Sequence, residues 1–285
     1  MNTGRAAHAA TFRKFALWMI LLVLATSLAC STPSLSSVVT GTEVSFGPCD
    51  NVLYPFFIGA HWVYQVDRQN GNDPTRFALT VTKVADSQAT VEALSLSTGV
   101  TTQVIADCDQ GAIRNFPLLS QDMLFGDLVT SDFSMTYVSG VFAPAQEAFL
   151  ANDWNYNWTA DYLLNGTVEA KIEGETIPIT LKDTPLHMVW QTAGVGDAAF
   201  EAVTVPAGTF ERALKVTNTA STDITFDLAG LPVTGSLTLH TTQWFEPFTG
   251  MLKSQIDSGE VTALGISFPV ELKGSVELVE YMTAH

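Results

Sequence analysis

Residue types that can carry out nucleophilic or acid–base chemistry are present in this sequence, but they do not form a known catalytic motif. There is no G-x-S-x-G, no Walker loop, no G-x-G-x-x-G and no H-E-x-x-H. His61, His187 and His240 each stand alone in a strand-like run. A histidine with no serine or cysteine partner in view gives nucleophilic catalysis little to build on. We therefore expect no enzymatic activity.

Residues 67–73 bring together oxygen ligands that could suit a calcium ion. This stretch offers carboxylates and a turn glycine, but it lacks the ligand order and the closing glutamate of an EF-hand. No C-x-x-C and no zinc-like Cys/His spacing occurs. We expect a polar hairpin tip here, with no metal and no cofactor. Paired carboxylates elsewhere remain an alternative, because two acidic residues are enough for a hydrolase.

The three cysteines are Cys30, Cys49 and Cys108. Cys49 follows a Gly-Pro pair in a predicted loop, and Cys108 lies between two aspartates, so neither resembles a core position. This favours a Cys49–Cys108 disulfide, formed in an oxidising compartment, over two buried free thiols. An odd count then leaves Cys30 to be explained.

The N-terminus has the features of a secretory signal peptide. Arg5, Arg13 and Lys14 form a basic start, and no acidic residue precedes Cys30. The apolar run at residues 15–25 is 11 residues long, whereas a membrane-spanning helix needs about 20. Small residues follow at the expected cleavage site. Residues 1–29 are therefore predicted to be a cleaved signal peptide.

The residues around Cys30 resemble the lipobox of bacterial lipoproteins. Ala29 supplies the small residue at −1 and Cys30 stands at +1, although Ser27 occupies −3, where leucine is usual. The resemblance implies that Cys30 carries lipid and tethers the protein to the cell membrane or outer membrane, facing outside the cytoplasm. Residues 30–45 would be a flexible Ser/Thr-rich tether, and residues 46–285 a single β domain. The alternative is an ordinary secreted protein cut nearby.

The charge of the mature chain is strongly negative. Removal of residues 1–29 takes away three of the 13 basic residues and none of the 29 acidic ones, which leaves a formal charge of −19. This charge argues against nucleic acid as a partner and against a domain lying flat on anionic lipid. Solubility is a sufficient reason for it.

Alternating hydrophobic residues predict β-strands through most of the mature chain. The clearest run has Phe268, Val270, Leu272, Val276 and Leu278 on one face, which is the period of a half-buried strand. Residues 210–217 and 236–246 repeat the pattern. Further strands are expected at residues 61–66, 76–84, 89–96, 101–106, 168–181, 187–192, 224–228 and 251–257.

Turn residues separate these runs. Residues 70–71 (Asn-Gly) and 97–99 (Ser-Thr-Gly) predict hairpins. At residues 205–208, Pro206 presets φ and Gly208 can take positive φ, so this segment should join one strand to the next. Helical signals are confined to residues 144–150 and 115–125. The predicted fold class is mainly β: a strongly curved antiparallel sheet, half-barrel or open barrel, with one or two short helices.

Aromatic residues are the candidates for ligand binding. Trp154, Tyr156 and Trp158 alternate and can line one face of an extended segment, with Phe149 nearby. Such a row suits an apolar cavity, but a packed β core uses the same residues.

Three segments together resemble an uncharacterised family of bacterial lipoproteins. Residues 53–64 (LYPFFIGAHWVY) are similar to its Y-x-P-x-x-x-G-x-x-W-x-Y opening, residues 203–210 to its V-P-A-G-T-F hairpin, and residues 244–254 to its W-F-x-P-x-x-G-x-x-K-S segment. More distantly the chain resembles the LolA/LppX-like half-barrel lipoproteins. That resemblance implies a lipid or other apolar ligand in the concavity of the sheet. The alternatives are a structural or protein-interaction envelope lipoprotein with a solid core, and an envelope hydrolase with paired carboxylates.

Overall fold

The computed structural model describes residues 47–68, 73–116, 133–172, 175–228, 231–270 and 274–283. The chain divides into two units, Met1–Ser45 and Phe46–His285, and every described residue belongs to the second. Cys30, the 70–71 turn and most of the 115–125 segment lie outside the described residues. Within the described part, no helix is long and apolar enough to cross a membrane.

The second unit is built on one antiparallel sheet. Its strands hydrogen-bond in the order β5-β4-β3-β2-β1-β14-β12-β11-β10-β8-β7-β6, with β13 on β12 and β9 on β10. The strands are β1 (His61–Asp67), β2 (Thr75–Ala85), β3 (Gln88–Ser95), β4 (Thr101–Asp109), β5 (Ala112–Asn115), β6 (Ser134–Gly140), β7 (Asn157–Ile172), β8 (Glu175–Thr192), β9 (Phe200–Val205), β10 (Gly208–Leu228), β11 (Leu231–Glu246), β12 (Gly250–Ala263), β13 (Ile266–Val270) and β14 (Ser275–Met282). Two short helices, α3 (Gln146–Ala151) and the 3-10 helix η2 (Gly196–Ala199), complete the described elements.

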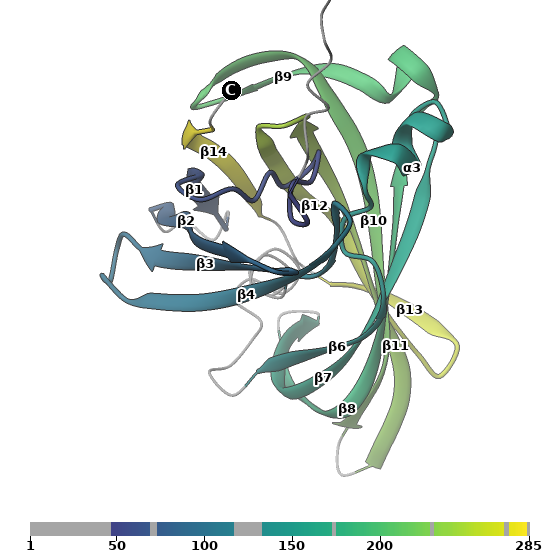
Figure 1. Ribbon diagram of the computed structural model, residues 1–285. Helices are drawn as coiled ribbons and strands as arrows, with labels where there is room; N and C mark the ends of the chain where they lie inside the picture. The colour runs from purple at the N-terminus through teal and green to yellow at the C-terminus, as the bar shows by residue number, and fades with distance from the viewer. Residues whose placement is uncertain are drawn as a thin grey trace, which may run out of the picture. The chain divides into compact units, whose positions relative to one another are not determined.

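The sheet curves until its two ends nearly meet (Figure 1). The end strands are β5 and β6, and a β-bridge joins Ile113 in β5 to Ala143, three residues beyond β6. The backbone N–H groups of these two residues donate to each other's carbonyls at 2.8 and 2.9 Å. At the opposite end of the long strands, β13 contacts β7. The predicted fold class, a strongly curved antiparallel sheet with very few helices, is confirmed.

Irregularities in the ladders fit this curvature, because a β-bulge bends its strand and increases the local twist. The register shifts between Leu164 and Gly166 on β7, and twice between β11 and β12. Gly235 allows a close backbone approach between β11 and β12, since a Cβ there would lie 2.3 Å from the carbonyl oxygen of Thr262. Long strands with these offsets can wrap around a core on one face.

Two predicted hairpins are confirmed. The first joins β9 to β10, where Val205 pairs with Gly208 and Gly208 has φ +141°. The second joins β3 to β4, with Gly99 at φ +73°. The predicted helix at residues 144–150 is also present, as α3.

Two predicted strands are wrong in their extent. Residues 168–181 form the end of β7 and the start of β8, with Ile172 opposite Glu175, so they are a hairpin and not one strand. Residues 268–278 divide into β13 and β14, with Gly274 outside both. Both pieces pair with the same side of β12, but their registers differ by one residue. Periodicity alone does not show such breaks, because a tight turn or a one-residue shift interrupts the alternation only briefly.

The segment before β1 lies inside the curve of the sheet. Tyr54 and Phe56 are buried there against Phe116, and Tyr54 also packs edge-on against Phe245 of β11. The backbone N–H of Phe248 donates to the carbonyl of Val52. In Figure 1 this purple segment runs close to β1 and β12. Residues of the family-like opening motif therefore fill the interior.

A disulfide fastens this segment to the sheet. Cys49 bonds to Cys108 in β4, with a Cα–Cα distance of 5.1 Å, within the usual range. Both cysteines are buried, at 0% and 4% exposure. The expectation that neither is a core position is wrong, because the inner segment covers the β4 face that carries Cys108.

Asn51 joins the two ends of the sheet from within. Its Nδ2 donates to the carbonyls of Gly111 and Pro144, both at 2.7 Å. Its Oδ1 accepts from the backbone N–H groups of Leu53 at 2.8 Å and Tyr54 at 3.1 Å. Gly111 precedes β5 and Pro144 follows β6, so one fully buried amide spans the gap between the end strands.

We expect Asn51→Ala to destabilise the domain by roughly 3 kcal/mol or more, because it leaves several buried backbone groups without partners. Urea unfolding followed by tryptophan fluorescence measures the loss. The matched control is Asn152→Ala, which removes an exposed amide that bonds the carbonyl of Ala148. Its expected cost is below about 1 kcal/mol. Equal costs for the two variants would contradict the role of Asn51.

Candidate functional site

The aromatic candidates from the sequence lie together around α3. Phe149 has no exposed surface, and its ring lies 5.5 Å from those of Trp154 and Trp158 and 5.9 Å from that of Tyr156. Trp158 in turn stacks on Trp190 of β8 with centroids 6.0 Å apart. The four predicted ligand-binding residues thus form one cluster with mutual ring contacts.

The row they were expected to form on an extended segment does not exist. Trp154 is in the left-handed region with φ +58°, within the turn that follows α3, and β7 begins only at Asn157. The turn folds Trp154 back on Phe149, and its other side packs against Phe200 at 5.0 Å. The rings therefore pack against one another.

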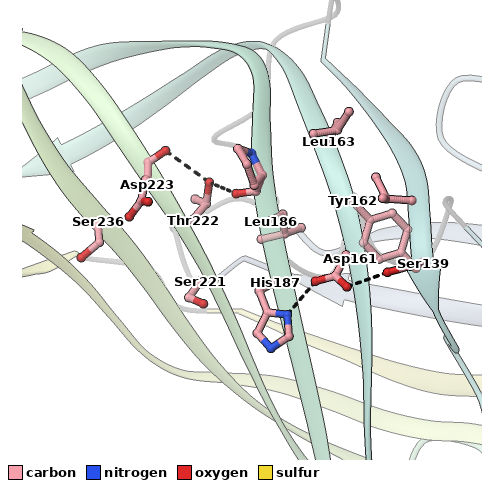
Figure 2. Close-up of a pocket in the computed structure, with 12 residues that line it drawn as sticks. Ser139, Asp161, Tyr162, Leu163, Leu186, His187, Ser221, Thr222, Asp223 and Ser236 are labelled. Carbon is pink, nitrogen blue, oxygen red and sulfur yellow. Dashed lines mark hydrogen bonds and ion pairs between the residues drawn. The ribbon is translucent and has the colours of Figure 1, made fainter.

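A separate pocket of ≈ 480 Å³ lies on the opposite, solvent-facing side of the sheet. It crosses β6, β7, β8, β10 and β11 (Figure 2). Its polar groups are the carboxylates of Asp161 and Asp223, the imidazole of His187, and the hydroxyls of Ser139, Ser221, Thr222 and Ser236. Val138, Leu163 and Pro185 contribute apolar lining, whereas Leu186 and Tyr162, which also border the pocket, are buried in the core.

Strand register brings the polar residues into one row. Ser139 is opposite Asp161, Asp161 is opposite His187, and His187 is opposite Ser221. Residues opposite each other on adjacent strands have Cβ atoms about 5 Å apart. Four positions spread over more than 80 residues of chain therefore become neighbours.

Hydrogen bonds fix the centre of this row. The Ser139 hydroxyl donates to Asp161 Oδ2 at 2.8 Å, and His187 Nδ1 lies 2.7 Å from Asp161 Oδ1 (Figure 2). The serine bonds to the carboxylate and not to the imidazole, so these three residues do not form the serine–histidine pair needed to activate a nucleophile. The arrangement orients a carboxylate; it does not prepare an attacking group.

In the pocket, hydrogen bonds stabilise the Asp161 carboxyl in its charged form. Hydrogen bonds from His187 and then Ser139 lower the pKa of Asp161 below its ordinary value of 3.8. Burial raises the pKa of Asp50 and Glu246, but neither of these two lines the pocket. A hydrolase with paired carboxylates needs one carboxyl of raised pKa in the site, and the pocket carboxyl with a resolved shift moves the other way. Among the described residues no group of three or more His, Cys, Asp or Glu side chains is placed to hold a metal ion.

Sequence reasoning missed this pocket. His187 was expected to stand alone, and in the structure it is bonded to Asp161. The rings of His61 and His240 lie within hydrogen-bond distance of threonine hydroxyls on neighbouring strands, Thr80 for His61 and Thr219 for His240. No local signal marks Asp161 and Ser139 as partners, because only the pairing of β6, β7 and β8 brings them together.

No protein-family model matches the sequence, and no curated protein matches it significantly. Two solved structures resemble the fold. A Bacteroides fragilis protein with a YmcC-like fold, provisionally described as exported, has 15% identity and a TM-score of 0.44, covering 82% of this chain and 100% of its own. A Parabacteroides distasonis protein, provisionally described as a lipoprotein, has 16% identity and a TM-score of 0.48, covering 81% and 99%. At this level of similarity neither assigns a family or an activity.

We expect His187→Ala to raise the pKa of Asp161 towards 3.8, because it removes the larger of the two hydrogen bonds that lower it. Carboxyl ¹³C NMR titration measures the shift. Because the pKa of Asp161 is lower in the folded state than in the unfolded state, its charged carboxylate stabilises the fold at pH values above the unfolded pKa. This stability is lost as the pH falls through the folded pKa. An unchanged Asp161 titration in the variant would show that the two side chains do not interact in solution.

Proposed function

We propose that this protein is an exported lipoprotein, acylated at Cys30, whose β domain acts outside the cytoplasm as a non-enzymatic interaction module. Residues 1–29 would be removed as a signal peptide, and residues 30–45 would tether the single domain of residues 46–285 to the membrane. The N-terminal pattern supplies the first argument for this proposal.

The observation that carries the proposal is the Cys49–Cys108 disulfide. Disulfides form and persist in oxidising compartments outside the cytoplasm. The bond also uses two of the three cysteines, so Cys30 is the one left for acylation. The bond fastens the segment before β1 to β4, so export to a compartment where it can form would stabilise this arrangement.

We expect wild-type protein to incorporate an alkyne analogue of palmitate in cells and Cys30→Ala to lose it, because no other cysteine stands at the predicted cleavage site. Click labelling followed by gel fluorescence measures incorporation. The matched control is the Cys49→Ala/Cys108→Ala double variant, which should keep the label. Label retained by Cys30→Ala would rule out acylation at this residue.

The ring contacts around Phe149 favour an interaction module with a packed core over an apolar-ligand carrier. An apolar ligand in this region would have to separate Phe149 from Trp154, Tyr156 and Trp158, and buried aromatic pairs are worth about 0.5–1.5 kcal/mol each beyond their area. The pKa of Asp161 is lowered, so this carboxylate gives no support to acid catalysis. A binding role without chemistry is therefore the proposal that fits the geometry best.

We expect no saturable binding of a fluorescent fatty acid to delipidated Cys30→Ser protein, which carries no acyl chain of its own. Fluorescence titration tests this, with a fatty-acid-binding protein as the positive control. Phe149→Ala is the matched variant, because removal of a fully buried ring opens a cavity that an apolar probe can enter. Uptake by Cys30→Ser protein that keeps Phe149 would favour the carrier function instead.

A further inference from the structure

We propose that the solvent-facing pocket across β6, β7, β8, β10 and β11 is a binding site for a small organic ammonium ion with an alkyl portion. The pocket is distinct from the aromatic cluster, and it does not depend on acylation of Cys30. Its size, ≈ 480 Å³, falls within the range of small-molecule sites, about 300–1,000 Å³.

Charge is the first argument. Two carboxylates, Asp161 and Asp223, line the pocket, and no lysine or arginine is among its lining residues. The acidic surface of the chain as a whole raises the local concentration of cations. His187 bonds one carboxylate oxygen of Asp161 and Ser139 bonds the other, and each oxygen keeps further capacity to accept a hydrogen bond. An ammonium group, a donor only, matches this set.

The other residues that line the pocket indicate which class of ligand it would bind. A bare divalent metal ion prefers several converging oxygen or nitrogen ligands, and no such group of three is present among the described residues. Val138, Leu163 and Pro185 beside the carboxylates provide apolar contact for an alkyl chain. The hydroxyls of Ser221 and Ser236 would also suit a sugar, but Tyr162, the one Phe, Tyr or Trp residue in the lining, is 1% exposed and offers no stacking surface, and the His187 ring is hydrogen-bonded to Asp161.

The site is rigid in the way that binding requires. Its residues lie on strands, and the row from Ser139 to Ser221 crosses the β6–β7, β7–β8 and β8–β10 ladders, with one register shift beside Ser139 on β6. Sites on regular elements keep their geometry better than sites on loops. The Ser139 and His187 hydrogen bonds hold the Asp161 carboxylate in one orientation before any ligand arrives.

The test is a titration of the full-length chain in detergent with n-butylammonium chloride, followed by ¹H–¹⁵N NMR. Saturable shifts are expected at the amides of β7, β8 and β10 around the pocket. Asp161→Asn and Asp223→Asn should each weaken binding about fivefold, the effect of one solvent-exposed ion pair, and added NaCl should weaken it further. Asp86→Asn is the matched control, since it removes one exposed charge in the β2–β3 turn and should leave the affinity unchanged.

Neutral and anionic probes of the same chain length show whether binding depends on the positive charge of the ligand or on its shape alone. n-Butanol and butyrate should not produce the saturable shifts. The proposal is overturned if butanol binds as well as butylammonium, if methyl glucoside binds in their place, or if Asp86→Asn weakens binding as much as the pocket variants. Asp223→Asn changes an exposed position, so it decides the matter even if Asp161→Asn fails to fold.

Discussion

The closure of the sheet depends on one buried amide. A sheet that curves this far brings two end strands, β5 and β6, close together without a full ladder between them, and unpaired strand edges are exposed to solvent or to other chains. In the described part of the chain one bridge joins Ile113 to Ala143 here, and Asn51 bonds the carbonyls on either side of it. All four hydrogen-bonding positions of the Asn51 amide are used in a dry interior, where a lost partner is costly. The segment before β1 therefore connects the two ends of the sheet through Asn51.

Filling the interior has a consequence for where a ligand can bind. The inner segment places Tyr54 and Phe56 among the side chains of the sheet, and Phe149 of α3 fills the space beside β7 and β8. In the described part of this chain, the rings proposed as a cavity lining contact one another instead. The pocket of ≈ 480 Å³ lies on the outer face, where long, twisted strands carry polar residues.

Local patterns predicted β1 to β4, much of β10, β11 and β12, the hairpin at residues 205–208 and the short helix at residues 144–150, because each rests on the φ preferences and side-chain periodicity of neighbouring residues. They did not predict β6 or the first part of β7. The curvature followed from the family resemblance and from the number of short-looped strands. The break between β13 and β14 was not predictable, since one shifted residue barely disturbs the alternation around Val270 and Val276. Burial of Cys49 was also missed, because a loop-like Gly-Pro context says nothing about a segment that folds back into the core.

The outer pocket was beyond sequence reasoning for a more general reason. Polar residues on the wet face of a strand are expected at every second position, so Asp161 and His187 look like any solvated pair in their own strands. Only the register of β7 against β8, which the buried face sets through residues such as Tyr162 and Leu186, puts these two side chains opposite each other. A one-residue slip of either strand would turn its polar side chain into the core. The hydrophobic face that stabilises the fold thus also determines which polar groups meet on the other side, and the binding chemistry of the outer face is fixed by the packing of the inner one.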